Sequence, residues 1–134
     1  MSALTTLTKT ARTLISAGTS NTSGSTTRGR CDLQTAQGGY LTIKVTNGAT
    51  GPTLQAVVNV LVAHNATMPA AASAGSDWKT IYSVGNGVAN NTVGEWGFPI
   101  DPSIMCIEVE VTSNTAQTVT CEAFLSELTN AQTV

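Results

Sequence analysis

Alternation of hydrophobic and polar residues predicts β-strands in this chain. In segment 41–46, Leu41, Ile43 and Val45 fall on one face of an extended strand, and threonine and lysine fall on the other. The run 54–64 is apolar on one face, partly apolar on the other, and rich in valine. Because β-branched residues lose χ1 freedom in a helix and pack well on a pleated sheet, this run predicts a central strand.

Two segments near the C-terminal end, 107–112 and 119–125, alternate in the same way and are joined by a short polar link. They predict a hairpin with one face in the core and the other in solvent. Glu108, Glu110 and Glu122 fall on the outward face, where we expect them to be exposed. The expected core residues of the hairpin are Ile107, Val109, Val111, Val119, Cys121, Ala123 and Leu125.

Weaker strand signals lie upstream of these segments and between them. Residues 65–77 are rich in alanine, serine and glycine, and their small side chains predict a long exposed connection. Glycine inside a strand suggests a bulge or a bend. The further predicted strands are residues 5–17, 26–36, 78–84 and 92–98, the last interrupted by Gly94 and Gly97.

Seven or eight short strands without a convincing helix indicate an all-β protein, a single-domain antiparallel β-sandwich of the jelly-roll-like kind. A chain of 134 residues has room for one such domain. We divide it into residues 1–25, an extended N-terminal arm with the first strand and a flexible linker, and residues 26–134, the sandwich body. The threonine-rich arm is a candidate for pairing with the sheet edge of a neighbouring subunit.

Composition narrows the class of protein. Charged residues make up 10% of the chain, against roughly 25% in typical soluble domains, and the net charge is -2. So weakly charged a surface favours a protein whose partners cover much of it. The six Lys and Arg residues are spread singly, so we expect no nucleic-acid partner. No basic leader and no apolar run of membrane-spanning length occur, so we expect a soluble protein with no membrane partner.

The chain offers little catalytic chemistry. His64 is the single histidine and no serine lies in a G-x-S-x-G motif, so we interpret His64 as a surface residue at a strand end. Glu108 and Glu110 could form a glycosidase-like pair or a weak cation site, but we favour a solubilising role on an exposed face. We therefore expect no enzyme activity, no catalytic, cofactor-binding or metal-binding residues, and no cofactor.

Cysteines and aromatic residues are the remaining candidates for disulfide, metal-binding or carbohydrate-binding roles. The three cysteines are odd in number and widely spaced, which predicts reduced core residues rather than a disulfide framework or a zinc site. They are Cys31, Cys106 and Cys121. Trp78, Tyr82, Trp96 and Phe98 could form a carbohydrate-stacking platform, although we favour core or interface anchors because aromatic residues total only 4%.

The stretches 40–52, 76–80, 107–112 and 119–123 together resemble small virion structural proteins of tailed bacteriophages, in particular capsid decoration (cement) proteins. The resemblance spans about residues 31–128. It lies in the general character of the sequence and in the order of strands and turns, without a diagnostic motif, so it carries over no functional residues. It implies a β-sandwich on the capsid exterior that bridges neighbouring subunits of the major capsid protein and stabilises the shell. The protein would be a homo-oligomer, a trimer or dimer, and would reside in the host cytoplasm during assembly.

Two alternatives stay open at this point. One is a tail or neck component of the same virion. The other is a carbohydrate-binding host-adsorption module that uses Trp78 or Trp96.

Overall fold

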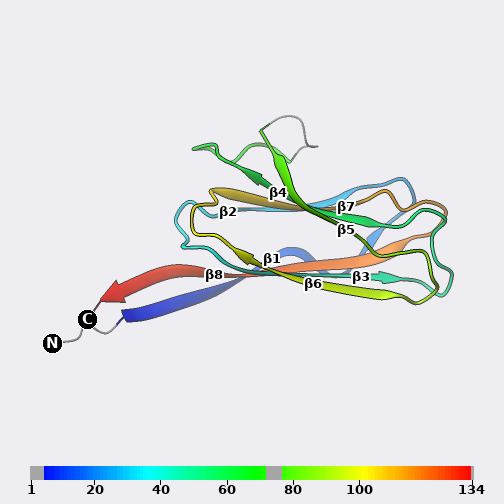
Figure 1. The fold of residues 1–134 in the computed structure, drawn as a ribbon, viewed down its shortest axis with the longest axis horizontal. Helices are drawn as coiled ribbons and strands as arrows, with labels where there is room; N and C mark the ends of the chain where they lie inside the picture. Colours follow the sequence, from blue (N-terminus) through cyan, green and yellow to red (C-terminus); the bar gives the residue numbers. More distant parts are fainter. Residues whose placement is uncertain (1–4, 72–76, 134) are drawn as a thin grey trace.

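A computed structural model describes residues 5–71 and 77–133 of the chain, and in these residues it contains eight strands and no helix (Figure 1). The strands are β1 (Thr5–Asn21), β2 (Thr27–Asp32), β3 (Gly39–Asn47), β4 (Val57–Ala63), β5 (Lys79–Gly85), β6 (Val93–Ile100), β7 (Cys106–Thr112) and β8 (Val119–Thr133). Each overlaps a strand expected from the sequence, so the all-β prediction is confirmed. The described residues accordingly provide no apolar helix that could cross a membrane.

The strands form two four-stranded antiparallel sheets that face each other as a sandwich (Figure 1). Sheet A has the order β1-β8-β3-β6, and sheet B has the order β2-β7-β4-β5. Only β4 and β5 follow each other within one sheet, since every other link carries the chain to the opposite sheet. Two sheets wound in this way make a jelly roll, the variety of sandwich that the sequence predicted.

The main core lies between the sheets and uses the residues that the alternating pattern assigned to it. Val58 and Val60 on β4 face Leu41, Ile43 and Val45 on β3, and all five side chains are almost fully buried. β4 lies between β7 and β5, which confirms the expected central strand. The seven core residues expected from segments 107–112 and 119–125 are also buried.

The predicted hairpin of those two segments is wrong, because β7 and β8 lie in opposite sheets. Strands of two facing sheets present the same alternation to one core as two paired strands would, so the pattern could not separate the cases. The link between them leaves ordinary strand geometry at Ser113 and Ala116, whose φ angles are 75° and 70°. Asn114 is fully buried there, and its Nδ2 donates to the carbonyl oxygens of Asn21 and Gln117 at 3.0 and 2.9 Å.

Part of the connection 65–77, which was expected to be exposed, packs on the outer face of sheet B over β4 and β7, while β5 of the same sheet remains largely exposed. Several residues of this connection, among them Ala66 and Thr67, are exposed, but Met68 is partly buried against the sheet and residues 72–76 lie outside the described ones. Trp78, where the connection ends, is fully buried and donates from Nε1 to the carbonyl oxygen of Ala70 at 2.9 Å. The second apolar cluster consists of Leu61, Ala63, Trp78 and Cys106, with Met68 and Met105 packed against it.

β1 and β8 continue beyond the sandwich body as a two-stranded ribbon, blue and red in Figure 1. The pairing of β3 with β8 ends where Gly39 lies opposite Glu127, and the loop before β3 adds two backbone hydrogen bonds to Leu128. From there to Thr133, β8 pairs only with β1 among the described residues. The division of the chain at residue 25 stays a prediction, since β1 belongs both to sheet A and to the ribbon.

Candidate functional site

The structure does not gather the residues considered for catalysis. His64 is exposed and immediately follows the last residue of β4, as expected for a strand-end histidine. Within residues 5–71 and 77–133, no group of three or more His, Cys, Asp or Glu side chains could hold a metal ion. That the protein has no enzyme activity stays a prediction.

Glu108 and Glu110 are buried, which overturns the prediction that they lie on an exposed face. Glu108 is fully buried and lies opposite Leu61 of the second apolar cluster, and Glu110 is 8% exposed. Arg28 on β2 forms ion pairs with both carboxylates, and its Nη1 lies 3.6 Å from Glu108 Oε1. Asn59 Nδ2 donates to Glu110 Oε1 at 2.9 Å. This is a structural ion-pair cluster, and neither carboxylate is placed to receive a substrate.

The three cysteines are buried free thiols, as predicted. Burial raises the pKa of Cys31, Cys106 and Cys121, and that of Cys121 reaches about 11. Since the thiolate is the nucleophile and the metal ligand, all three stay in the unreactive thiol form at neutral pH.

The four aromatic residues considered as a carbohydrate platform do not form one. Trp78 is buried under the outer face of sheet B, which excludes the stacking role considered for it. Tyr82 on β5 and Phe98 on β6 stack across the open edge of the sandwich, with ring centroids 4.5 Å apart. Trp96 is partly buried against the main core, and its ring occupies the space that a side chain at Gly94 would take.

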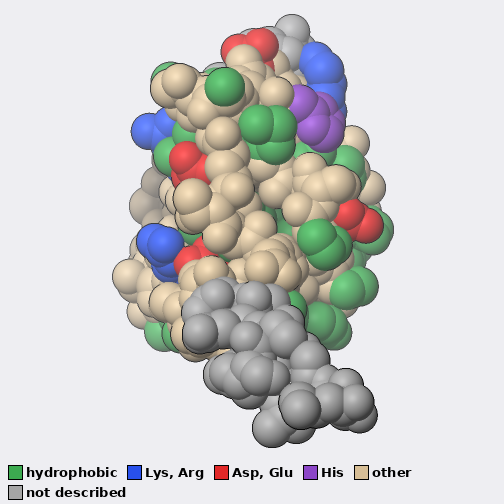
Figure 2. Space-filling view, turned by 90° about the vertical axis from the view of Figure 1, so that its left-hand side faces the viewer, with side chains coloured by type: hydrophobic (Ala, Val, Ile, Leu, Met, Phe, Trp, Pro, Cys, Tyr) green, Lys and Arg blue, Asp and Glu red, His purple; other side chains and the backbone are tan. Residues whose placement is uncertain are grey.

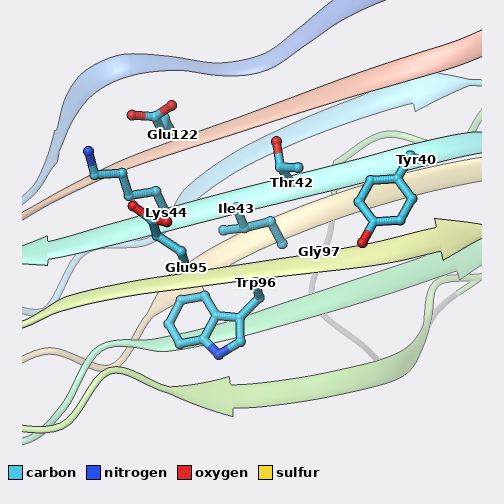
Figure 3. A pocket seen from close by; sticks show the side chains of 8 residues that line it. All are labelled: Tyr40, Thr42, Ile43, Lys44, Glu95, Trp96, Gly97 and Glu122. Atoms are coloured by element: carbon cyan, nitrogen blue, oxygen red, sulfur yellow. The ribbon is translucent and has the colours of Figure 1, made fainter.

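An open groove of about 500 Å³ lies on the outer face of sheet A (Figure 3). The strand register places Lys44 of β3 between Glu95 of β6 and Glu122 of β8. Tyr40 lies further along β3, is 50% exposed, and shows its ring almost face-on in Figure 3. The groove is lined by Tyr40, Thr42, Ile43, Lys44, Glu95, Trp96, Gly97 and Glu122.

Gly97 determines how Tyr40 lies. A Cβ at Gly97 would sit 2.6 Å from the Tyr40 hydroxyl oxygen and 2.8 Å from its ring, so a larger residue would displace the phenol. The tyrosine ring therefore rests over β6, as aromatic residues do when they cover a glycine in a neighbouring strand. From the sequence we expected only a bulge or a bend at Gly97 and missed Tyr40, because this pair is visible only once the register of β3 and β6 is known.

The terminal ribbon is the second exposed feature. Leu7 on it is 54% exposed, and no charged residue occurs in segment 5–8 or in segment 129–133. Arg12 and Glu127 join β1 to β8 close to where the ribbon leaves the body, with Arg12 Nε donating to Glu127 Oε1 at 2.8 Å. This contact raises the pKa of Arg12, so the guanidinium stays charged.

The loops at the opposite end of the sandwich are held by asparagine side chains. Asn47 is buried and donates from Nδ2 to the carbonyl oxygens of Gly87 and Ala89 at 3.2 and 2.9 Å. Asn86, also buried, donates from Nδ2 to Asn47 Oδ1 at 3.0 Å. These contacts tie the β5–β6 loop to the end of β3.

No protein-family model and no curated protein matches this chain. Among solved structures it is similar to the Yersinia pseudotuberculosis-derived mitogen, at 9% identity over 92% of this chain and 87% of that one, with a TM-score of 0.45. It is also similar to a family 16 carbohydrate-binding module, at 12% identity over 87% and 75% of the two chains and a TM-score of 0.45.

A third similar structure is that of the infectious bursal disease virus Gx strain, at 13% identity and a TM-score of 0.48. That match covers 90% of this chain and 32% of the viral one, so the present chain spans about a third of it. With TM-scores below 0.5, none of these similarities bears on what this chain binds or does.

Proposed function

We propose that this protein is a non-enzymatic structural component of a tailed-bacteriophage virion. It decorates the exterior of the capsid, bridges neighbouring subunits of the major capsid protein, and stabilises the shell. The projecting ribbon of β1 and β8 is the observation that carries the proposal (Figure 1). The resemblance of the strand-turn sequence to decoration proteins supports the same assignment.

The ribbon has the properties of an attachment element. An isolated two-stranded ribbon is only marginally stable in water, so this one needs a further contact to be well ordered. Soluble proteins protect exposed strand edges with charged residues, especially lysine, but segments 5–8 and 129–133 contain none. A strand of a neighbouring protein can therefore add to either edge through backbone hydrogen bonds.

The sandwich body suits the same purpose. Its two sheets enclose a continuous apolar core, and the loops opposite the ribbon are tied down by buried asparagines, so the body is stiff. Low charge on its surface permits close approach of identical copies and of the shell. We propose a trimer or a dimer, because symmetric oligomers fit the symmetry axes of a capsid.

The experiment that tests this function is cosedimentation with shells of the encoding phage that lack the protein. The wild-type protein is expected to bind saturably, and removal of residues 2–9 to abolish binding while Ile15 and the rest of β1 keep sheet A intact. Leu7→Lys, which places a charge on the ribbon, is expected to weaken binding. Leu54→Lys is the matched control, because Leu54 is 60% exposed in a loop at the opposite end.

Light scattering on the free protein gives its oligomeric state before the shells are added. Unchanged binding after removal of residues 2–9 would show that the ribbon is not the attachment element. A folded wild-type protein that ignores shells but binds purified tails or necks would transfer the assignment to those parts of the virion.

A further inference from the structure

The groove on the outer face of sheet A combines an aromatic surface with a polar row. Tyr40 presents half of its surface to solvent while Gly97 beneath it leaves room for the ring to lie over β6. Small-molecule sites are concave and pair apolar or aromatic contact area with a few placed polar groups. Figure 3 shows the polar groups to one side of Tyr40, along the direction of β3.

The polar row restricts the charge of what can bind. Glu95 and Glu122 flank Lys44 on the two neighbouring strands, so the row carries two negative charges and one positive charge. An anionic ligand would be repelled by two carboxylates with one ammonium to attract it. A neutral polyhydroxylated ligand meets acceptors in the carboxylates and donors in Lys44 and the hydroxyl of Thr42.

We infer that this groove binds a neutral saccharide, with the apolar face of one pyranose ring stacked on Tyr40 and the hydroxyls of the next sugar along the row of Glu95, Lys44 and Glu122. The volume of about 500 Å³ lies in the range of small-ligand sites and accommodates two or three sugar units. This inference does not rest on the proposed capsid function. It also differs from a platform built on Trp78 or Trp96, because Trp78 is fully buried and Trp96, although it lines the groove, packs against the main core.

The test is a titration of the ¹⁵N-labelled protein with three neutral hexasaccharides, the β-1,4- and α-1,4-linked glucose oligomers and the β-1,4-linked N-acetylglucosamine oligomer. An oligogalacturonate hexamer serves as the anionic probe. We expect saturable amide shifts around Tyr40, Thr42 and Lys44 with at least one neutral probe, and none there with the anionic probe.

The variants separate stacking from a general surface effect. Tyr40→Ala is expected to weaken binding by about tenfold or more, as loss of a central aromatic contact does, whereas Tyr40→Phe keeps most of the affinity. Tyr82→Ala is the matched control, because Tyr82 is 42% exposed but stacks on Phe98 away from the groove. Its affinity is expected to stay within about twofold of wild type.

Three results would each overturn the inference. They are the absence of saturable shifts with all three neutral probes, binding of the anionic probe alone, and equal weakening by Tyr40→Ala and Tyr82→Ala. Because Tyr40 is half exposed, Tyr40→Ala is expected to stay folded, and its ¹⁵N spectrum checks this before the two variants are compared.

Discussion

The outward-facing residues at the middle of β3 in sheet A and of β7 in sheet B are polar in both strands but have different environments. On sheet A the outward residues of β3, such as Thr42, remain open to solvent and form one wall of a groove. On sheet B the outward residues of β7 are buried, and Glu108 has no exposed surface at all. Figure 2 shows how thinly charged side chains are scattered over one side of the molecule, with most of the surface neither charged nor apolar.

The two faces differ because their strands lead into different connections. β3 leads into the loop 48–56 at the end of the sandwich, whereas β4 leads into a longer connection of which Met68 and Trp78 pack against sheet B. Trp78 and Met68 pack there with Leu61, Ala63, Met105 and Cys106 as a second apolar cluster. Strand alternation identifies which residues share a face, but it does not tell whether water or protein covers that face.

Removal of Trp78 would break the contrast between the two faces most strongly. Trp78→Ala is expected to lower the free energy of unfolding by about 3–5 kcal/mol, because it leaves a cavity in the second apolar layer. Urea denaturation measures this loss. Trp96→Ala is the control, and its loss is expected to be smaller because Trp96 is only partly buried.

Thiol labelling of Trp78→Ala shows which of the two apolar clusters opens. Cys106 belongs to the second layer, whereas Cys31 and Cys121 belong to the main core. Labelling of native Trp78→Ala with a thiol reagent is therefore expected to modify Cys106 first. Equal labelling of all three thiols would mean that the second layer does not open separately from the main core.

Loss of Arg28 tests the buried charges on the covered face. Arg28→Met leaves Glu108 and Glu110 without their guanidinium partner, and we expect a loss of about 2–4 kcal/mol in the free energy of unfolding. Thermal and urea unfolding measure the loss. A variant as stable as wild type would mean that this face admits enough water to solvate the two carboxylates.

The pH dependence of stability compares the main core with the second layer. Burial holds the pKa of Cys121 at about 11 in the folded protein, above its unperturbed value of 9.0, so the folded state retains a proton that the unfolded state loses. The corresponding stability is complete below pH 9 and declines as the pH rises through the folded pKa.

As the pH rises from 8 to 10.5, ionisation of Cys121 in the unfolded state is expected to lower the free energy of unfolding by about 2 kcal/mol. Urea denaturation of the wild type and of Cys121→Ala across that pH range separates the contribution of Cys121 from that of the other titrating groups. Cys106→Ala should remove a smaller part of the slope. The reverse order would show that the second layer excludes water better than the main core does.

The smallest effect is expected on the open face. Lys44→Met removes a cation that the strand register places between two glutamates, but we expect a change within about 0.5 kcal/mol because water screens charges on this open face. Urea denaturation at low salt is the appropriate measurement. A loss comparable with that of Arg28→Met would show that the two faces are electrostatically alike.

Local sequence was sufficient to specify the strands and the residues that point into the main core. Period-two alternation around Leu41 and Val109 specifies which side chains share a face, and β-branched residues favour extended backbone wherever they occur. The buried thiols and the exposed position of His64 at the end of a strand followed from residue types and spacing alone.

Strand pairing and the covering of each face depend instead on tertiary packing. Facing sheets and paired strands satisfy the same alternation, so nothing local could place β7 and β8 in opposite sheets. The fully buried Glu108 forms an ion pair with Arg28 of β2, and the position of Tyr40 depends on Gly97 across β3 and β6. Such contacts join residues tens of positions apart, and their physical origin is the packing of one element on another, which no local pattern encodes.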